Sequence, residues 1–171
     1  MPLYVTLAVC ALALVCLGAA IAAIAIGKHV FTKTTTHSTV AMGQPVRDGN
    51  FMFTADKMKC GIHQIGTPDD YQTPTGQFCI VSMKITNVGK EPAIYADSIQ
   101  KAFNPNGNRY TADTPAGYYA NPDPLVFLNE INPGNHITVQ IVYDIPNGAS
   151  IDKLELHENP YTKGAIVRMP H

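Results

Sequence analysis

Tryptophan is absent from the 171 residues, which excludes an immunoglobulin core of the antibody kind, because that core is built around a buried tryptophan. An excess of basic residues is also absent, since 12 Lys and Arg stand against 13 Asp and Glu. This balance argues against nucleic acid as the main partner, because phosphate binding needs a basic face. Helical periodicity is missing after the first segment, while 13 Pro and 13 Gly supply many turns. We therefore expect one all-β domain.

Catalytic and metal-binding motifs are missing as well. The six histidines show no His-x-His or His-x-x-x-His spacing, and His63 near Cys60 is the only pair close to a metal-ligand arrangement. Four acidic residues lack a partner at catalytic spacing and are interpreted as turn and loop residues: Asp69, Asp70, Asp123 and Glu130. No phosphate loop or nucleophile signature occurs. We expect no catalytic residue, no metal and no cofactor.

The first 27 residues contain no charged side chain. Residues 3–26 are almost entirely apolar, and as a helix they would span roughly 36 Å, enough to cross a bilayer core of about 30 Å. We expect residues 1–27 to form a transmembrane anchor. The alternative is a cleaved signal peptide, with residues 20–22 as its cleavage site. The anchor is favoured because nothing basic precedes the apolar run and because the run continues to Ile26.

Small residues recur every four positions in this predicted helix. Gly18 and Ala22 lie on one such row, and Ala19 and Ala23 lie on another. Residues four apart share one face of a helix, and small side chains let two helices approach closely within lipid. We predict that the anchor packs against another transmembrane helix. The alternative is a plain anchor in which alanine is simply abundant.

Charge around the anchor conflicts with the expected location of the domain. Lys28 and Lys33 follow the apolar run and nothing basic precedes it, so the positive-inside rule would place the C-terminal domain in the cytoplasm. The cysteines described below favour an oxidising compartment instead. A basic segment upstream of Met1 would resolve the conflict. We expect a single-pass protein of the plasma membrane with its domain on the extracytoplasmic side.

A change in composition marks the start of the folded domain. Residues 28–44 are rich in Thr and Ser without an apolar period, which is typical of a flexible stalk. Residues 45–171 contain short apolar alternations separated by Gly, Pro and Asn turns, and so predict an antiparallel β-sandwich of two sheets. The expected strands are 51–60, 77–87, 93–97, 99–103, 109–111, 136–145, a segment around 154–156, and 166–169.

The segment 136–145 has the clearest alternation in the chain. Its odd-numbered positions are all apolar or aromatic, and the opposite face is polar except for Val142. A period of two over ten residues predicts a half-buried strand of an antiparallel sheet. The rest of the domain is expected to cover the face that carries Val139, while Gln140 points outward.

Two cysteines lie in the domain, at the expected ends of neighbouring strands. Cys60 closes the strand 51–60, and Cys79 opens the strand 77–87. Facing strand ends allow the Cα separation of roughly 5.5 Å that a disulfide requires, and closing a loop of about twenty residues contributes about 3 kcal/mol in the chain-entropy treatment. We predict a Cys60–Cys79 disulfide and an oxidising compartment. Two free buried thiols are the alternative.

Tyr118 and Tyr119 stand in a long loop, 112–124, that has room for one helical turn. Exposed aromatic side chains are good anchors at protein interfaces, so these two tyrosines are candidate interaction residues. Alternatively, they cover one open end of the sandwich.

Several motifs together resemble a secreted bacterial family of unknown function, described as telokin-like or as an immunoglobulin-like antigen fold. They are GQFCIV at 76–81, ITNVGKEP at 85–92, QKAF at 100–103, FLNEINPG at 127–134, YDIP at 143–146 and LELH at 154–157. The resemblance covers about 44–169 and implies an extracytoplasmic, immunoglobulin-like β-sandwich of the kind found in actinobacteria and related Gram-positive bacteria. It also implies a cysteine pair at Cys60 and Cys79, and it supplies no catalytic or binding residue.

These features together predict a membrane-anchored, extracytoplasmic module that binds and does not catalyse. One form is an accessory subunit of a cell-envelope membrane complex, which requires a helix with a tight packing face. The other is a free-standing secreted ligand-binding or adhesion protein released by signal cleavage, which requires an apolar patch or pocket on the domain. The expected partners are a membrane and a protein.

Overall fold

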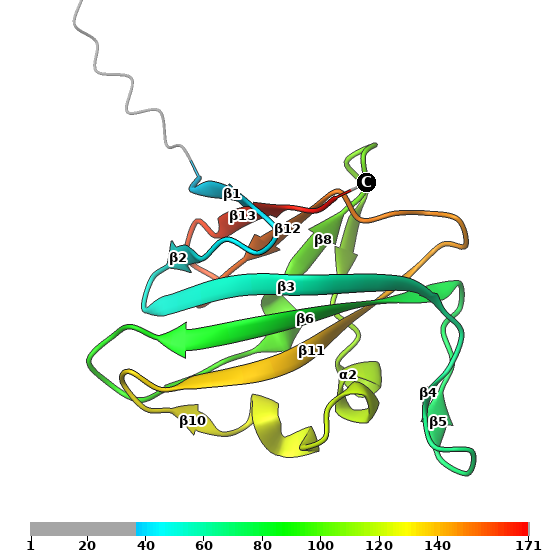
Figure 1. Cartoon of the computed structure of the whole chain (residues 1–171), viewed down its shortest axis with the longest axis horizontal. Helices are drawn as coiled ribbons and strands as arrows, with labels where there is room; N and C mark the ends of the chain where they lie inside the picture. Colours follow the sequence, from blue (N-terminus) through cyan, green and yellow to red (C-terminus); the bar gives the residue numbers. More distant parts are fainter. Residues whose placement is uncertain (1–36, 171) are drawn as a thin grey trace, which may run out of the picture. The chain divides into compact units, whose positions relative to one another are not determined.

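The computed structural model of the protein describes residues 37–170, which belong to one compact unit, His37–His171. Two β-sheets form the layers of this unit (Figure 1). The predicted anchor, 1–27, lies outside the described residues. Within 37–170, no helix is long and apolar enough to cross a membrane.

The first sheet contains the two long strands that the alternation predicted. Its order is β11-β6-β3-β2, and its strands are β2 (Val46–Asp48), β3 (Phe51–Ile62), β6 (Gln77–Asn87) and β11 (His136–Ile145). All three pairings are antiparallel. The predicted strands 77–87 and 136–145 are confirmed with the same bounds.

The second sheet is built from short strands in the order β1-β13-β12-β8-β9. They are β1 (Thr39–Ala41), β8 (Lys101–Phe103), β9 (Arg109–Thr111), β12 (Lys153–Leu156) and β13 (Ala165–Arg168). β1 runs parallel to β13, and the other pairings are antiparallel. Two short ladders accompany the sheets: β7 (Ala93–Ile94) with β10 (Glu130–Ile131), and β4 (Ile65–Gly66) with β5 (Tyr71–Gln72).

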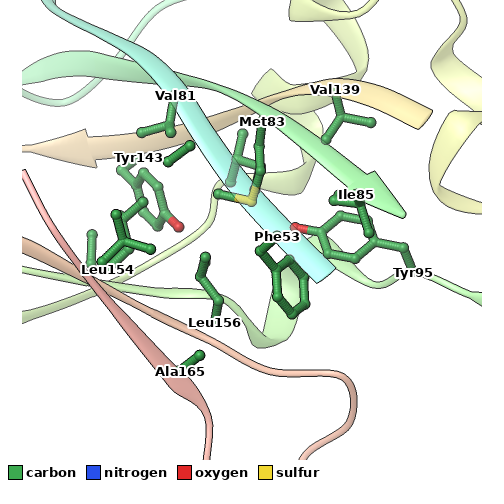
Figure 2. Close-up of a cluster of buried hydrophobic side chains, with 14 of the residues drawn as sticks. Phe53, Val81, Met83, Ile85, Tyr95, Val139, Tyr143, Leu154, Leu156 and Ala165 are labelled. Carbon is green, nitrogen blue, oxygen red and sulfur yellow. The ribbon is translucent and has the colours of Figure 1, made fainter. Parts of the chain in front are cut away.

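The main core lies between the two sheets (Figure 2). From the four-stranded sheet it takes the odd-numbered side chains of β6 and β11, among them Val81, Met83 and Val139, which are fully buried. From the five-stranded sheet it takes Leu154 and Leu156, which are equally buried. Each large apolar side chain removed from water in this way contributes about 1.5–3 kcal/mol. The predicted burial of one face of β11 is confirmed.

A second, smaller apolar cluster lies on the opposite face of the four-stranded sheet. There α2 (Thr114–Ala120) and β4 cover Phe78 and Val142, and Val142 is only 1% exposed. We expected Val142 to be an apolar exception on an outward-facing surface. The structure corrects this, because the loop 112–124 folds back over the sheet. The expected helical turn is seven residues long, and Asp113 caps it by accepting a hydrogen bond from the Ala116 amide at 3.0 Å.

The folded unit begins before residue 45. β1 lies within 28–44, which we expected to be a stalk, and it joins the sheet beside β13. Composition hides this strand, because Val40 is its one large apolar side chain. The predicted strand 93–97 ends early, at Ile94, because the chain enters the 3-10 helix η1 (Asp97–Ile99) with Asp97 buried. A second 3-10 helix, η2 (Pro124–Phe127), precedes β10.

Candidate ligand-binding groove

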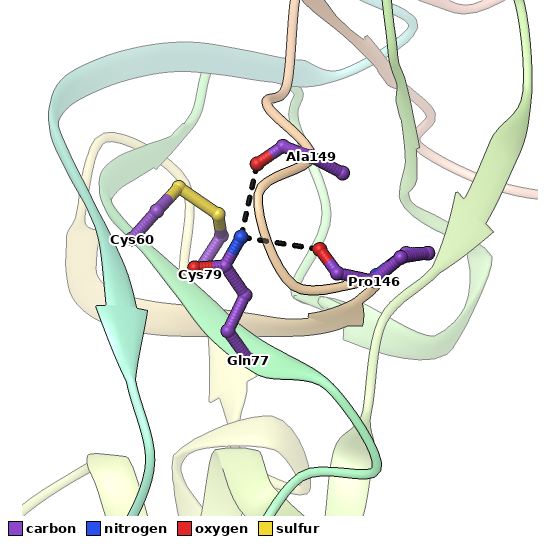
Figure 3. Close-up of a disulfide and its surroundings, with 5 residues drawn as sticks. All are labelled: Cys60, Gln77, Cys79, Pro146 and Ala149. Atoms are coloured by element: carbon purple, nitrogen blue, oxygen red, sulfur yellow. Dashed lines mark hydrogen bonds between the residues drawn. A yellow bond between two sulfur atoms is a disulfide. The ribbon is translucent and has the colours of Figure 1, made fainter.

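A disulfide and a buried side-chain amide fasten one end of the sandwich (Figure 3). Cys60 and Cys79 are joined, with their Cα atoms 4.0 Å apart, as the sequence predicted. On the same strand as Cys79, Gln77 donates from Nε2 to the carbonyl oxygens of Pro146 at 3.1 Å and Ala149 at 3.0 Å. The turn that follows β11 is therefore tied to the start of β6.

The carboxylate of Asp144 also stabilises this end of the sandwich. It accepts hydrogen bonds from the backbone N–H groups of Thr75 at 2.6 Å and Gly76 at 3.1 Å. Glycine is required at position 76, because a Cβ atom there would collide with the carbonyl oxygen of Ile145. The segment before β6 is thus held directly against the end of β11.

Three adjoining hollows form a groove at the edge of the sandwich where β9 and β11, the edge strands of the two sheets, approach each other. The central hollow has a volume of about 510 Å³ and shares Arg109 and Thr111 with a hollow of about 220 Å³. It shares Asp144 with a third hollow of about 460 Å³. We call these hollows together the edge groove. Its lining includes Lys101, Arg109, Thr111, Asp113, Asp144 and Pro146.

One end of the edge groove is basic. Lys101 Nζ lies 2.7 Å from Glu155 Oε1, and His157 Nε2 lies 2.9 Å from the same oxygen. Partial burial acts to raise the pKa of Glu155, but the hydrogen bonds from Lys101 and His157 outweigh it and hold that pKa below its ordinary value. Arg109 has no ion-pair partner within 37–170. A free guanidinium beside a fixed ammonium group can bind a carboxylate or phosphate group of a ligand.

Side-chain amides continue the backbone ladders beside the groove. Gln100 donates to the carbonyl of His157 at 2.9 Å and accepts from its N–H at 2.8 Å, just beyond the last residue of β12. Asn121 likewise donates to the carbonyl oxygen of Gln140 in β11 at 2.9 Å and accepts from the Gln140 N–H at 2.8 Å. The backbone groups of Gln140 at the edge of the sheet are thereby satisfied, which protects this stretch of β11 from pairing with another strand.

Three buried polar side chains, Tyr95, Asp97 and Tyr143, interact electrostatically in the core. One carboxylate oxygen of Asp97 and both tyrosine hydroxyls have no hydrogen-bond partner among residues 37–170. Burial raises the pKa of Asp97, and a hydrogen bond from Thr114 only partly opposes this effect. Burial likewise raises the pKa of both tyrosines. These groups belong to the core rather than to the groove.

The predicted aromatic interaction residues lie on α2 and do not line the groove. Tyr119 packs in the second apolar cluster and donates its hydroxyl to Asp70 at 2.7 Å. Tyr118 is 39% exposed and packs against Phe127, with ring centroids 6.3 Å apart. An interface role for either tyrosine stays a prediction.

The other predicted interaction residues are in the anchor, outside the described part of the chain: Gly18, Ala19, Ala22 and Ala23. Of the side chains considered as metal ligands, Cys60 is taken by the disulfide. In the described part of the chain, no group of three or more His, Cys, Asp or Glu side chains is arranged to hold a metal ion.

Sequence reasoning missed the edge groove. Its walls come from β8, β9, α2 and β11, which are far apart along the chain, so no spacing between Arg109 and Asp144 signals their approach. One local signal was available: Asp113 followed by Thr114-Pro115 is a helix start, and it stands directly after a short strand. That pattern places a helix N-terminus at the end of an edge strand.

Solved structures share the fold of this domain. MPT63, a secreted protein from Mycobacterium tuberculosis, aligns with a TM-score of 0.58 and 16% identity over 79% of this chain and 99% of that protein. The yjhA protein from Bacillus subtilis aligns with a TM-score of 0.54 and 13% identity over 79% of this chain and 100% of that protein. A conserved hypothetical protein from Bacillus anthracis aligns with a TM-score of 0.50 and 19% identity over 72% of this chain and 93% of that protein. At these identities the likeness shows the fold alone.

No curated protein matches this chain. The family described as a domain of unknown function, DUF4352, matches residues 40–166, which hold most of both sheets and the disulfide. The resemblance drawn from the sequence motifs is confirmed. The chain therefore belongs to the DUF4352 family, and its domain is an immunoglobulin-like β-sandwich of unknown function.

Proposed function

We propose that the protein is a membrane-anchored, extracytoplasmic binding module without catalytic activity, and that the edge groove receives its ligand. The observation that carries this proposal is that the three hollows share lining residues along the two edge strands, Arg109 and Thr111 on β9 and Asp144 on β11. The wall of the hollow at the Asp144 end is held by the hydrogen bonds of Asp144 to Thr75 and of Gln77 to Pro146. A site that is already ordered loses little conformational entropy when it binds, which favours affinity.

The charged groups of the groove support binding rather than catalysis. A general acid or base works best with a pKa near the working pH and with a proton free to move. Glu155 has a lowered pKa and is engaged by both Lys101 and His157. These groups hold one another in place, so they offer a ligand a fixed charge pattern.

The location rests on two features of the chain. The apolar run 3–26 is long enough to remain in a bilayer as an anchor. The Cys60–Cys79 disulfide favours an oxidising compartment, as outside the cytoplasmic membrane. The accessory-subunit form adds a packing face on the anchor to this arrangement, and the groove receives the ligand in either form.

Site-specific photo-crosslinking in living cells tests the groove. A photoreactive phenylalanine analogue at Thr111, in the groove, is compared with one at Asn106, in the exposed turn before the same strand. We expect a crosslinked adduct of defined mass from position 111 and none from 106. Equal adducts at both positions, or none at either, would contradict the groove as the binding site.

Alkaline extraction of membranes tests the anchor in the same cells. A transmembrane anchor keeps the full chain in the pellet, and protease added to spheroplasts should remove the domain. Recovery of the domain in the growth medium with a new N-terminus near residues 20–22 would instead establish the secreted, free-standing protein. Protection of the domain from protease would place it in the cytoplasm and overturn the proposed location.

A further inference from the structure

The outer face of the four-stranded sheet is covered by α2 at one end and is open at the other. Along the open part, β2, β3 and β6 contribute exposed Lys or Arg side chains and β11 contributes an exposed histidine, and alternation places these side chains opposite to the core. We call this surface the basic face. Its members are Arg47 from β2, Lys57 and Lys59 from β3, Lys84 from β6 and His136 from β11.

The positive charge of the basic face is not neutralised within the domain. Both ion pairs among residues 37–170 involve Glu155, which lies on the five-stranded sheet. Within the four-stranded sheet, Asp48 is buried and accepts hydrogen bonds from backbone N–H groups, and Asp144 does the same. Asp56, in a β-bulge beside Lys57, is the one exposed carboxylate on its strands. The whole chain carries a formal charge of −1, whereas the strands of this face carry four exposed Lys and Arg side chains against one exposed carboxylate.

A hollow of about 280 Å³ lies within the basic face. Its lining combines two ammonium groups, a hydroxyl and an amide with two isoleucines: Lys57, Lys59, Ser82, Gln140, Ile62 and Ile80. The Ser82 hydroxyl donates to Gln140 Oε1 at 2.9 Å. A phosphodiester with apolar substituents matches this mixture, because ammonium groups attract the phosphate while isoleucine side chains accept methylene groups.

We propose that the basic face docks the domain on an anionic phospholipid surface, with the hollow taking one phosphodiester headgroup. A sheet face is broad enough for several lysines to reach the headgroup layer together. Each Lys or Arg near an anionic membrane surface adds to the attraction, and the effect is screened by salt. The occupant is therefore a membrane surface rather than a single soluble anion.

The length of the preceding chain supports this occupant. Only ten residues, 27–36, separate the apolar run from the described domain. Even fully extended, ten residues reach at most about 35 Å. If the apolar run is the anchor of the proposed function, the domain stays close to the bilayer, and weak attraction by the basic face suffices to hold it there.

Vesicle flotation with the purified domain 37–171 tests the docking. The unit has its own core and disulfide, and solved structures that consist almost wholly of this fold show that it stands alone. We expect it to float with vesicles of phosphatidylglycerol and phosphatidylcholine, and not with phosphatidylcholine alone. Rising NaCl should release it. Because the purified domain lacks the segment 1–27, the result does not depend on whether the full chain is anchored, nor on whether the edge groove binds a ligand.

Matched charge reversals locate the surface. Lys57→Glu with Lys59→Glu should lower partition onto anionic vesicles by about tenfold or more. Lys163→Glu with Arg168→Glu, exposed and off the basic face, changes net charge equally and should lower partition much less. Thermal melts of both variants should match the parent. Equal losses in the two variants, or binding to soluble polyphosphate as tight as to vesicles, would overturn the proposal.

Discussion

The two faces of the four-stranded sheet carry different kinds of side chain on the same strands. On the inner face, Met83 and Val139 are fully buried beneath a whole second sheet. On the outer face, Val142 is buried beneath the short helix α2, whereas Lys84 and Thr138 are exposed. One face is uniform along its length, and the other changes character within a few residues.

The difference shows that alternation sets the face to which a side chain points, whereas the segment packed over that face sets whether the side chain is buried. A period of two sends neighbouring side chains to opposite faces, but it does not say what will lie over either face. The loss of unfolding free energy on substitution therefore depends on whether another segment buries the substituted side chain. We therefore expect large effects on the inner face and effects that depend on position on the outer one.

The sharpest test replaces adjacent residues of β11. Val139→Asp buries an unpaired carboxylate in the main core, which costs several kcal/mol against a total stability of about 5–15 kcal/mol, so the domain should unfold. Gln140→Asp is the matched control on the partly exposed outer face and should change the free energy of unfolding by only about 1 kcal/mol. Thermal and urea unfolding measure both. Equal melting would show that the two faces do not differ as described.

The disulfide anchors the inner face at one end of the sheet. Cys60→Ala with Cys79→Ala removes a crosslink across 19 positions and should lower the free energy of unfolding by about 3 kcal/mol. Urea unfolding gives the value, and parent protein under reducing conditions should show a similar loss. Two alkylatable thiols in natively purified parent protein would show that the bond does not form in the cell.

The smallest expected effect concerns Asp97, one of the three buried polar side chains described above. The folded pKa of Asp97 is raised from 3.8 by burial, so between these two values the folded state holds its proton more tightly than the unfolded chain. The contribution of Asp97 to the free energy of unfolding therefore falls as pH rises through that window. Asp97→Asn should remove this fall and gain stability relative to the parent toward neutral pH.

A difference between the two pH profiles isolates Asp97 from other groups. Glu155, whose pKa is lowered, acts in the opposite direction: its contribution is present above the unfolded pKa and is lost as pH falls. Glu155 titrates in both proteins and cancels in the difference. Parallel profiles of the parent and Asp97→Asn would show that Asp97 is not shifted.

The strands β6 and β11, the inner face and the disulfide could be predicted from the amino-acid sequence alone. Each depends on local pattern: alternation identifies the buried positions of 136–145, and Cys60 and Cys79 stand at predicted strand ends. The sequence did not reveal β1, because Thr39–Ala41 has too little apolar character to stand out and becomes a strand only beside β13.

The burial of Val142 and the two candidate binding surfaces depend on how distant segments of the chain pack together. Val142 looks exposed by alternation, and it is buried because α2 returns across the sheet. Arg109 and Asp144 line one groove because β9 and β11 are edge strands of different sheets that approach each other. Lys59 and Lys84 share a face because β3 and β6 pair in one register. Contacts between distant segments follow from packing the whole chain, which no local spacing encodes.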